Sequence, residues 1–296
     1  PIGSAAREAQ EAHVPAAAFQ QHVRAARTDF EHHVAQARAD FDIANEKIKA
    51  RTGRNLILAT LIGLAVGAVT LASLIFIKWL FLVFALPVAL LGAFEFTRAL
   101  QGAGRRVDVV PQMLAGAALV LSGFFLDPWL HWVTAFAAVA FEVVWRLVAQ
   151  MVEHDGRAYA LVLGDGLVSA FVQLYVPFLA SFALILLRQE SGEWWLIAML
   201  GVAVSVDTGA YGAGLSFGRH PMAPRISPKK TWEGFAGAVV ASAVAGVLFG
   251  IFLLHIPWWA GLIFGLVILG TATMGDLGES MIKRDLGIKD MSSWLP

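Results

Sequence analysis

Two polar segments in the last third of the chain carry residue types that bind phosphate and metal ions. The first, from position 225 to 234, reads Arg-Ile-Ser-Pro-Lys-Lys-Thr-Trp-Glu-Gly. Serine followed by proline is typical of a helix N-cap and first helical position, and lysines in a first turn oppose the helix dipole unless an anion lies there. We therefore predict a helix N-terminus that binds phosphate. Its side chains are Arg225, Ser227, Lys229, Lys230 and Thr231.

The second segment, from position 274 to 290, reads Met-Gly-Asp-Leu-Gly-Glu-Ser-Met-Ile-Lys-Arg-Asp-Leu-Gly-Ile-Lys-Asp. As a helix it places Asp276, Lys283 and either Glu279 or Ser280 on one face. A carboxylate beside basic residues suits a hard cation that bridges to phosphate, and Mg²⁺ fits best. We expect Asp276 to be the metal ligand and Lys283 and Arg284 to contact the anion. Taken alone, the segment also fits a salt-bridged helix end with Glu279 and Lys283 as an i,i+4 pair.

Asp207 lies in an otherwise apolar stretch before the first segment. An acid in such a stretch usually faces a polar cavity or a partner. The glycines at 209, 212, 214 and 218 allow either close helix packing or close approach of a ligand. We predict that four acids orient the bound groups: Asp207, Glu233, Glu279 and Asp290.

The elements that position these residues are membrane-spanning helices. Hydrophobic residues make up 58% of the 296 and charged residues 15%, with a mean hydropathy of +0.67, whereas about a quarter of a soluble domain is charged. Eight windows approach the length of about 17–25 residues that a span needs, and lipid-exposed runs must be helical. They are Asn55–Ile77, Trp79–Phe96, Val109–Leu126, Pro128–Val148, Leu161–Leu187, Trp194–Phe217, Phe235–Leu254 and Pro257–Gly275. The predicted fold is an all-α polytopic membrane protein.

The basic residues predict how the chain is oriented. With the N-terminus in the cytoplasm and eight spans, 20 of the 22 lysines and arginines fall on the cytoplasmic side, leaving only Lys78 and Arg188 opposite. We predict a cytoplasmic amphipathic helical tail over residues 1–54, a five-span bundle over 55–192 and a catalytic bundle over 193–296. Both polar segments then lie on the cytoplasmic side. The alternative is that the lysine-rich segment is a loop that only fixes topology.

Three further acids fall within the predicted spans: Glu95, Glu142 and Asp165. Intramembrane acids are candidates for function by default. For Glu95 and Glu142 we expect local ion pairs with Arg98 and Arg146. Asp165 is a weaker candidate for the border of a lipid-entry cavity.

Composition narrows the function classes. The formal net charge is zero, so we expect no nucleic-acid partner, and the absence of cysteine excludes disulfides and thiolate chemistry. An ion-coupled transporter is the main alternative, since acids within spans and glycine-broken helices also suit transport. It predicts polar residues near mid-membrane in both halves, whereas here they concentrate in the last third.

Together, the two segments resemble the phosphatidate cytidylyltransferases, also called CDP-diacylglycerol synthases. Residues 280–296 match the first part of that family's C-terminal signature, and Asp207 with residues 227–234 matches its other familiar block. The resemblance covers roughly residues 205–296. It implies transfer of CMP from CTP to phosphatidic acid, giving CDP-diacylglycerol and pyrophosphate, by an enzyme embedded among membrane lipids.

The resemblance also sets expectations for the metal site and the assembly. It implies Mg²⁺, with a second metal ion, held by Asp276 and by two aspartates that follow a His-Gly-Gly stretch beyond the position of Pro296. We expect either further chain there or a site lacking half of its metal ligands, as in a scaffold with an inactive site. The family suggests a homodimer. A CTP-dependent lipid-alcohol kinase of similar build stays open.

Overall fold

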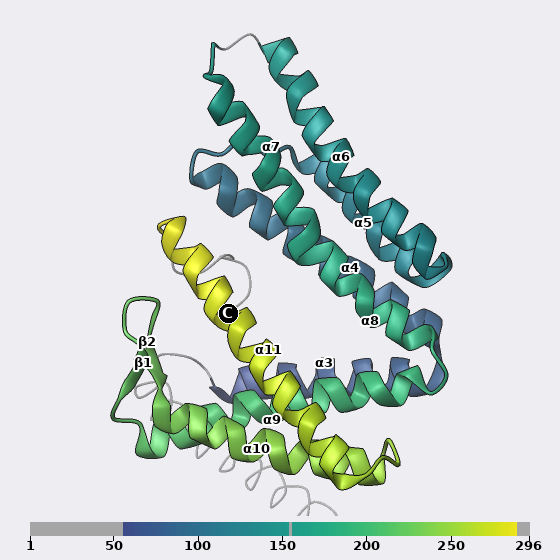
Figure 1. Cartoon of the computed structure of the whole chain (residues 1–296), viewed down its shortest axis with the longest axis vertical. Helices are drawn as coiled ribbons and strands as arrows, with labels where there is room; N and C mark the ends of the chain where they lie inside the picture. Colours follow the sequence, from purple (N-terminus) through teal and green to yellow (C-terminus); the bar gives the residue numbers. More distant parts are fainter. Residues whose placement is uncertain (1–55, 154–155, 289–296) are drawn as a thin grey trace, which may run out of the picture. The chain divides into compact units, whose positions relative to one another are not determined.

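The computed structural model describes residues 56–153 and 156–288, so the predicted tail over 1–54 lies outside the described part. The described part consists of helices and one short hairpin (Figure 1). The first elements are α3 (Leu56–Phe76), α4 (Lys78–Gly102), α5 (Val109–Phe125), α6 (Pro128–Glu153), α7 (Tyr159–Gln173), the π-helical turn η1 (Leu174–Phe178) and α8 (Leu179–Arg188). The others are α9 (Gly192–Phe217), β1 (Pro221–Ala223), β2 (Ser227–Thr231), α10 (Trp232–Phe252) and α11 (Trp258–Asp285). Everything from Ala68 to the end of α11 belongs to one compact unit.

Six helical segments of the described chain are long and apolar enough to cross a membrane. They are Lys78–Gly102, Pro128–Glu153, Tyr159–Arg188, Gly192–Phe217, Trp232–Phe252 and Trp258–Asp285. Two shorter apolar helices, over Ile62–Phe76 and Val109–Phe125, correspond to the other predicted windows. The predicted all-helical membrane fold is confirmed, and the count of eight is approximate.

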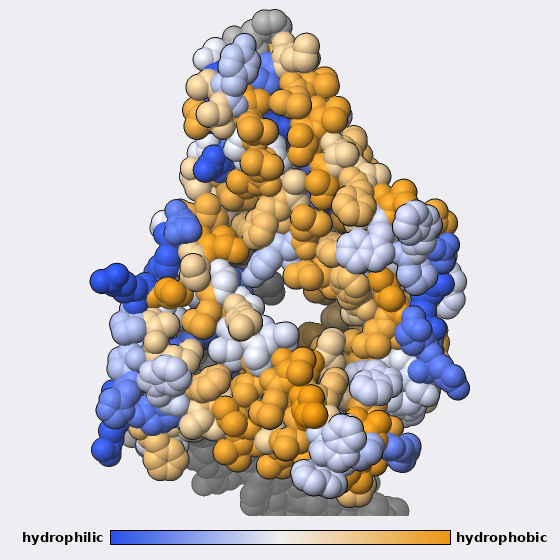
Figure 2. Space-filling model, viewed as in Figure 1, coloured by the Kyte–Doolittle hydropathy of each residue, from blue (hydrophilic) through white to orange (hydrophobic). Residues whose placement is uncertain are grey.

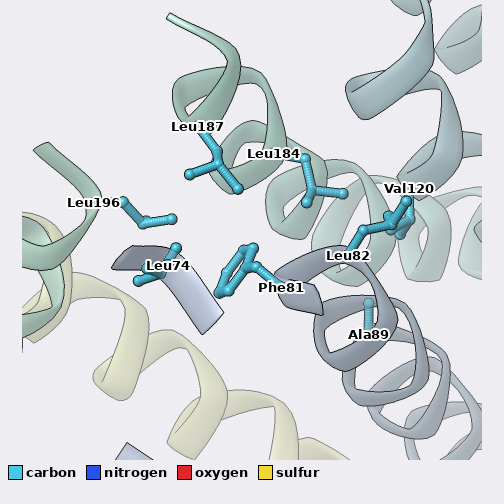
Figure 3. Close-up of a cluster of buried hydrophobic side chains, with 8 residues drawn as sticks. All are labelled: Leu74, Phe81, Leu82, Ala89, Val120, Leu184, Leu187 and Leu196. Atoms are coloured by element: carbon cyan, nitrogen blue, oxygen red, sulfur yellow. The ribbon is translucent and has the colours of Figure 1, made fainter. Parts of the chain in front are cut away.

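Much of the surface of these helices is apolar. Figure 2 shows hydrophobic side chains over much of the visible face, and Tyr159, Phe76 and Leu215 are among many large side chains with most of their area exposed. Lipid tails solvate such a surface, whereas water penalises it by roughly 25 cal/mol per Å². One buried cluster joins α3, α4, α5, α8 and α9 (Figure 3). It consists of Leu74, Phe81, Leu82, Ala89, Val120, Leu184, Leu187 and Leu196.

Lys78 and Arg188, the two basic residues expected on the sparsely charged side, lie at one end of this unit. The chain leaves helical geometry at Ile77, so α4 begins at Lys78 as its own helix. Lys78 Nζ lies 2.9 Å from Glu193 Oε2 and donates to the Leu187 carbonyl at 3.2 Å. Because Leu187 immediately precedes Arg188, both cations are at the turn between α8 and α9.

The opposite end carries arginines paired with acids. Asp165 in α7 is fully buried, and its carboxylate lies 2.5 Å from Arg157 Nη1 and 3.8 Å from Arg105 Nη1. A buried carboxylate is costly unless it is paired, and these two guanidinium groups supply the charge. These ion pairs within the protein account for the acid at position 165 without a lipid-entry cavity.

The ion pair predicted between Glu142 and Arg146 is not formed. Glu142, 1% exposed, accepts a 2.9 Å hydrogen bond from Gln112 Nε2. Arg146, also 1% exposed, instead lies 2.8 Å from Glu153 Oε2 and 3.5 Å from Asp108 Oδ2. Glu153 and Asp108 lie near the end of α6, where Arg146 can reach them. Glu142 lies instead beside the side-chain amides of Gln112 in α5 and Gln173 in α7.

Glu95 likewise forms no ion pair with any described residue. Arg98 donates from Nη1 to Gln101 Oε1 at 3.2 Å. Both Glu95 and Gln101 are three residues from Arg98, one toward each end of the helix, so sequence spacing did not distinguish them. The prediction for Glu95 is therefore also wrong.

Close backbone contacts hold α9, α10 and α11 together. Figure 1 shows α9 and α10 running side by side, and both pack against α11. A Cβ placed on Gly237 would lie 2.6 Å from the carbonyl of Gly209, and one on Gly261 would lie 2.6 Å from the carbonyl of Gly246. Glycines therefore let these three helices approach closely, which fixes the elements that carry the polar segments.

Candidate active site

The two polar segments meet through one ion pair. Lys230 in β2 contacts Asp276 of α11 through Nζ and Oδ2. The Lys230 side chain is 23% exposed and the Asp276 side chain 57% exposed, so the lysine is half-buried under the hairpin while the carboxylate remains accessible. Residues 46 positions apart in sequence thus share one site, as predicted for the lysine-rich segment and the carboxylate.

The lysines lie on a strand and not in a helix. β2 spans Ser227–Thr231 and pairs antiparallel with β1, so the prediction of Ser227 as N-cap and Pro228 as first helical residue is wrong. The cap is Thr231, whose hydroxyl accepts from the backbone N–H of Gly234 at 3.1 Å. Threonine is nearly as good a helix N-cap as serine. A proline is tolerated in β2 because both strands of a two-stranded hairpin are edge strands.

The strand geometry separates the two lysines. Successive side chains of a strand point to opposite faces. Lys230 points to α11, and Lys229 is exposed and makes no ion pair with any described residue. Of the two predicted catalytic lysines, the structure brings only Lys230 to Asp276.

Glu233 holds the base of the hairpin. Its Oε2 accepts from the backbone N–H groups of Arg219 and His220 at 3.1 and 3.2 Å, and its Oε1 lies 2.6 Å from His220 Nδ1. Trp232 N–H in turn donates to the His220 carbonyl at 2.9 Å. Glu233, predicted to orient substrate, therefore anchors the loop that enters β1, and His220 is a partner that its sequence position did not reveal.

The C-terminal half of α11 contributes the other charged groups. Lys283 Nζ lies 2.6 Å from Glu279 Oε1, which is the i,i+4 pair considered from the sequence. Arg284 Nε donates to the carbonyl of Ile226 at 3.3 Å and so ties α11 to the tip of the hairpin. Ser280 is half-buried on the same helix. The predicted face of α11 is thus present, with two contacts from α11 to the hairpin.

Asp207 approaches the ion pair from α9. It interacts electrostatically with both Asp276 and Lys230. Its side chain is exposed, and within residues 56–153 and 156–288 its carboxylate makes no hydrogen bond or ion pair. Three elements, α9, β2 and α11, therefore bring two carboxylates and one ammonium group together.

The remaining predicted residues are less engaged. Arg225 is exposed and Ser227 half-buried, both in or next to the hairpin, and their side chains bond to no other described residue. Asp290 lies outside the described residues. Of the glycines near Asp207, Gly209 packs on α10 and Gly218 lies against Thr231, while a Cβ on Gly212 would meet nothing.

The described residues fit a metal ion that arrives with a polyphosphate. No group of three or more acidic or histidine side chains gathers for metal binding in the described part of the chain. Mg²⁺ is commonly bound by one or two carboxylates together with substrate phosphates and water. Asp276 and Asp207 supply that number of carboxylates, and Lys230 is paired with Asp276.

Tyr175 is a further residue near the site that sequence reasoning missed. It belongs to η1, and its hydroxyl interacts electrostatically with Glu279, Lys283 and Asp276. The only signal in the sequence is a single phenol in the apolar stretch 161–187, two residues before a proline at 177. Nothing in that pattern indicates that α11 packs beside it.

Comparisons with known proteins identify the family of this chain. A sequence model described as the cytidylyltransferase family matches residues 57–296. The phosphatidate cytidylyltransferase of Mycobacterium tuberculosis (strain H37Rv) is 35% identical over 260 residues, covering 83% of this chain and 77% of that protein. That of Mycobacterium leprae is 35% identical over 262 residues, covering 83% and 81%. The Aquifex aeolicus protein of the same name is 39% identical over 124 residues, or 40% and 44% of the two chains. This chain belongs to the cytidylyltransferase family.

Proposed function

We propose that this chain transfers CMP from CTP to phosphatidic acid, forming CDP-diacylglycerol and pyrophosphate for phospholipid synthesis. The observation that carries the proposal is the contact between Lys230 and Asp276 at the end of a membrane helix. It supports the proposal because an ammonium group can bind phosphate and a carboxylate can bind a hard cation, and the pair lies at a helix end where a lipid headgroup and a soluble nucleotide can meet. The relatives named phosphatidate cytidylyltransferase support the same reaction.

The reaction requires positioning and charge neutralisation. A phosphate oxygen of phosphatidic acid attacks the α-phosphorus of CTP, and the bond from that phosphorus to the oxygen bridging to the β-phosphate breaks. Pyrophosphate leaves with the bridging oxygen. A phosphate monoester is already largely ionised at neutral pH, so no general base is needed. Catalysis then rests on alignment of the reacting groups and on stabilisation of negative charge.

Lys230 and Arg284 supply the positive charge in this mechanism. The ammonium group of Lys230 has three donors, so it can hold Asp276 and donate to a phosphate oxygen together. Arg284 uses Nε on the hairpin carbonyl and keeps its terminal nitrogens for a phosphate. Lys283, Lys229 and Arg225 are proposed as outer anion contacts, with Ser227, Thr231 and Ser280 as hydroxyl donors.

Mg²⁺ is the proposed cofactor. Asp276 and Asp207 would hold it together with the phosphates of CTP, and Asp290 remains a predicted contributor outside the described residues. When bound, the ion neutralises charge on the triphosphate. The two carboxylates fix where the nucleotide lies relative to Lys230.

We further propose that the site and the N-terminal tail face the cytoplasm, with the chain in the cell membrane. Support comes from the 20 basic residues assigned to one side and from the grouping of Lys78 and Arg188 at the other end of the bundle. CTP is a cytoplasmic metabolite in this assignment. The homodimer and the division into bundles over 55–192 and 193–296 stay predictions.

The test follows two phosphorus atoms of CTP separately. Purified full chain is incubated with phosphatidic acid, Mg²⁺ and CTP labelled with ³²P at either the α or the γ position. The proposal predicts α label in the lipid and γ label in pyrophosphate, with loss of both products in EDTA. With a lipid alcohol in place of phosphatidic acid, label from the γ position in the lipid would indicate a kinase. Labelled lipid from neither form would contradict a transferase and favour a transporter or an inactive scaffold.

A further inference from the structure

A π-helical turn interrupts the long α7–α8 span beside the proposed site. η1 covers Leu174–Phe178 and contains Pro177, whose missing N–H removes a helical hydrogen bond. Such turns shift the side-chain register of a helix and are frequent at functional positions. Tyr175 is the second residue of this turn. The π-helical turn therefore sets the direction of the Tyr175 side chain.

Two aromatic neighbours pack against the ring of Tyr175. Phe171 stacks on it with a centroid separation of 5.3 Å, and Phe96 of α4 meets it edge-on at 5.9 Å. Ile282 of α11 and Leu286, which follows the helix, pack on the same buried cluster as Tyr175. The ring therefore lies in a packed apolar layer between α4, α7 and the last turns of α11.

Charged groups of α11 act on the hydroxyl of Tyr175. It interacts electrostatically with Glu279, Lys283 and Asp276. Within the described ranges it makes no hydrogen bond, and Glu279 already holds Lys283 at 2.6 Å. A half-buried phenol normally finds a hydrogen-bond partner, so this O–H is a donor that the described protein does not use.

We propose that Tyr175 is a substrate-binding residue whose hydroxyl donates a hydrogen bond to a phosphate oxygen in the site around Asp276. The inference rests on the proposed function and names a contact from the first helical bundle to substrate. Phe171 already stacks on the ring, so the contact that we assign to substrate is the one made by the hydroxyl. The phosphate belongs either to CTP or to phosphatidic acid, and kinetics can distinguish the two.

The decisive variant is Tyr175→Phe, which removes one oxygen and keeps the ring. The control for phenol loss is Tyr159→Phe, at an exposed position at the start of α7. The control for ring packing is Phe171→Leu, which loosens the same cluster and leaves the hydroxyl in place. Steady-state kinetics in mixed micelles vary CTP at saturating phosphatidic acid and then the reverse, alongside thermal unfolding of each variant.

We expect Tyr175→Phe to lower kcat/KM about tenfold to a hundredfold for one substrate, as loss of a hydrogen bond to a charged group does. A fall for CTP assigns the contact to the triphosphate, and a fall for phosphatidic acid assigns it to the lipid phosphate. Tyr159→Phe should match the unaltered chain. The inference is overturned if Tyr175→Phe stays within about twofold for both substrates, or if Phe171→Leu causes the same loss. An unaltered chain that makes no labelled lipid overturns the proposed function as well.

Discussion

Lys229 and Lys230 are adjacent and chemically identical, yet the fold gives them different surroundings. Lys230 is half-buried against Asp276, and Lys229 is exposed on the other face of β2. The difference follows from strand geometry, in which neighbouring side chains alternate. In the helical turn expected from the sequence, both lysines would have surrounded one anion.

This alternation predicts unequal losses for two matched substitutions. Lys230→Gln should lower kcat/KM about tenfold to a hundredfold, because it removes a charged donor from the site. Lys229→Gln should lower kcat/KM several-fold less, since the Lys229 side chain is exposed and does not contact Asp276. Steady-state formation of CDP-diacylglycerol measures both. Equal losses would mean that the two lysines act together, as a helical N-terminus would have required.

Sequence spacing predicted which polar residues lie together better than it predicted their local geometry. The i, i+3/i+4, i+7 spacing placed Asp276, Glu279 and Lys283 on one helical face, and a helix is what forms there. The Ser-Pro-Lys-Lys run fits either a helix start or a hairpin strand, and pairing with β1 decides between them. Tyr175 was not predictable, because its proximity to α11 is a tertiary contact.

At the scale of elements, the site depends on three helices packed backbone to backbone. α9, α10 and α11 carry Asp207, the hairpin and Asp276, and their separation is set by glycines. In a membrane, packing of this kind replaces the hydrophobic effect as the force between helices. A side chain at the close contacts should therefore shift the polar segments apart.

Two glycines of α11 provide a matched test. A Cβ on Gly261 would lie 2.6 Å from the Gly246 carbonyl, whereas one on Gly270 would meet nothing within 4 Å. Gly261→Ala should destabilise the fold by about 1–3 kcal/mol through overpacking. Gly270→Ala should leave stability unchanged or raise it by up to about 1 kcal/mol through helix propensity. Thermal unfolding in detergent measures both, and equal behaviour of the two variants would contradict the packing.

The positions of the helices were predictable because the length of each apolar run is enough to identify a membrane-spanning helix. The split at Lys78 and the single long window over 161–187 both appear in the structure. The π-helical turn inside that window was not predicted, since a proline in a membrane helix can produce several local geometries. The hairpin between α9 and α10 was also not predicted, because its strands are too short to produce a recognisable alternation of residues.

At the scale of the whole molecule, basic residues lie at both ends of the helical bundle. Lys78 and Arg188 meet at the turn between α8 and α9. Arg105 and Arg157 share Asp165 at the other end, where Ile282 of α11 packs beside the helix that leads to Arg105. The basic residues that the sequence assigned to the same side of the membrane therefore lie at the same end of the structure. Which end faces the cytoplasm is part of our proposal.

The absence of native cysteine makes the orientation measurable. Single-cysteine variants at Pro224, in the exposed hairpin tip, and at Gln189, in the exposed turn after α8, would be labelled with a membrane-impermeant maleimide. In intact cells Gln189→Cys should react and Pro224→Cys should react only after permeabilisation. The reverse pattern would contradict a cytoplasmic site.

Buried acids show where whole-molecule arrangement limits prediction. Glu142 was assigned to the nearest arginine in sequence, yet its partner is Gln112 from another helix. Arg146 turns instead to Asp108 and Glu153 near the membrane surface. Partner choice inside a bundle depends on which helices are neighbours, and one sequence does not specify that.

The central claim is that Asp276 and Lys230 meet around a polyphosphate and transfer a nucleotide to a lipid. The most direct measurement compares Asp276→Asn with Asp285→Asn, an exposed carboxylate at the end of the same helix, in the assay with α-labelled CTP, phosphatidic acid and Mg²⁺. We predict that Asp276→Asn lowers the rate of labelled lipid formation at least about a hundredfold with an unchanged unfolding temperature, while Asp285→Asn stays within about threefold. Retention of more than about a tenth of the activity by Asp276→Asn would contradict the claim.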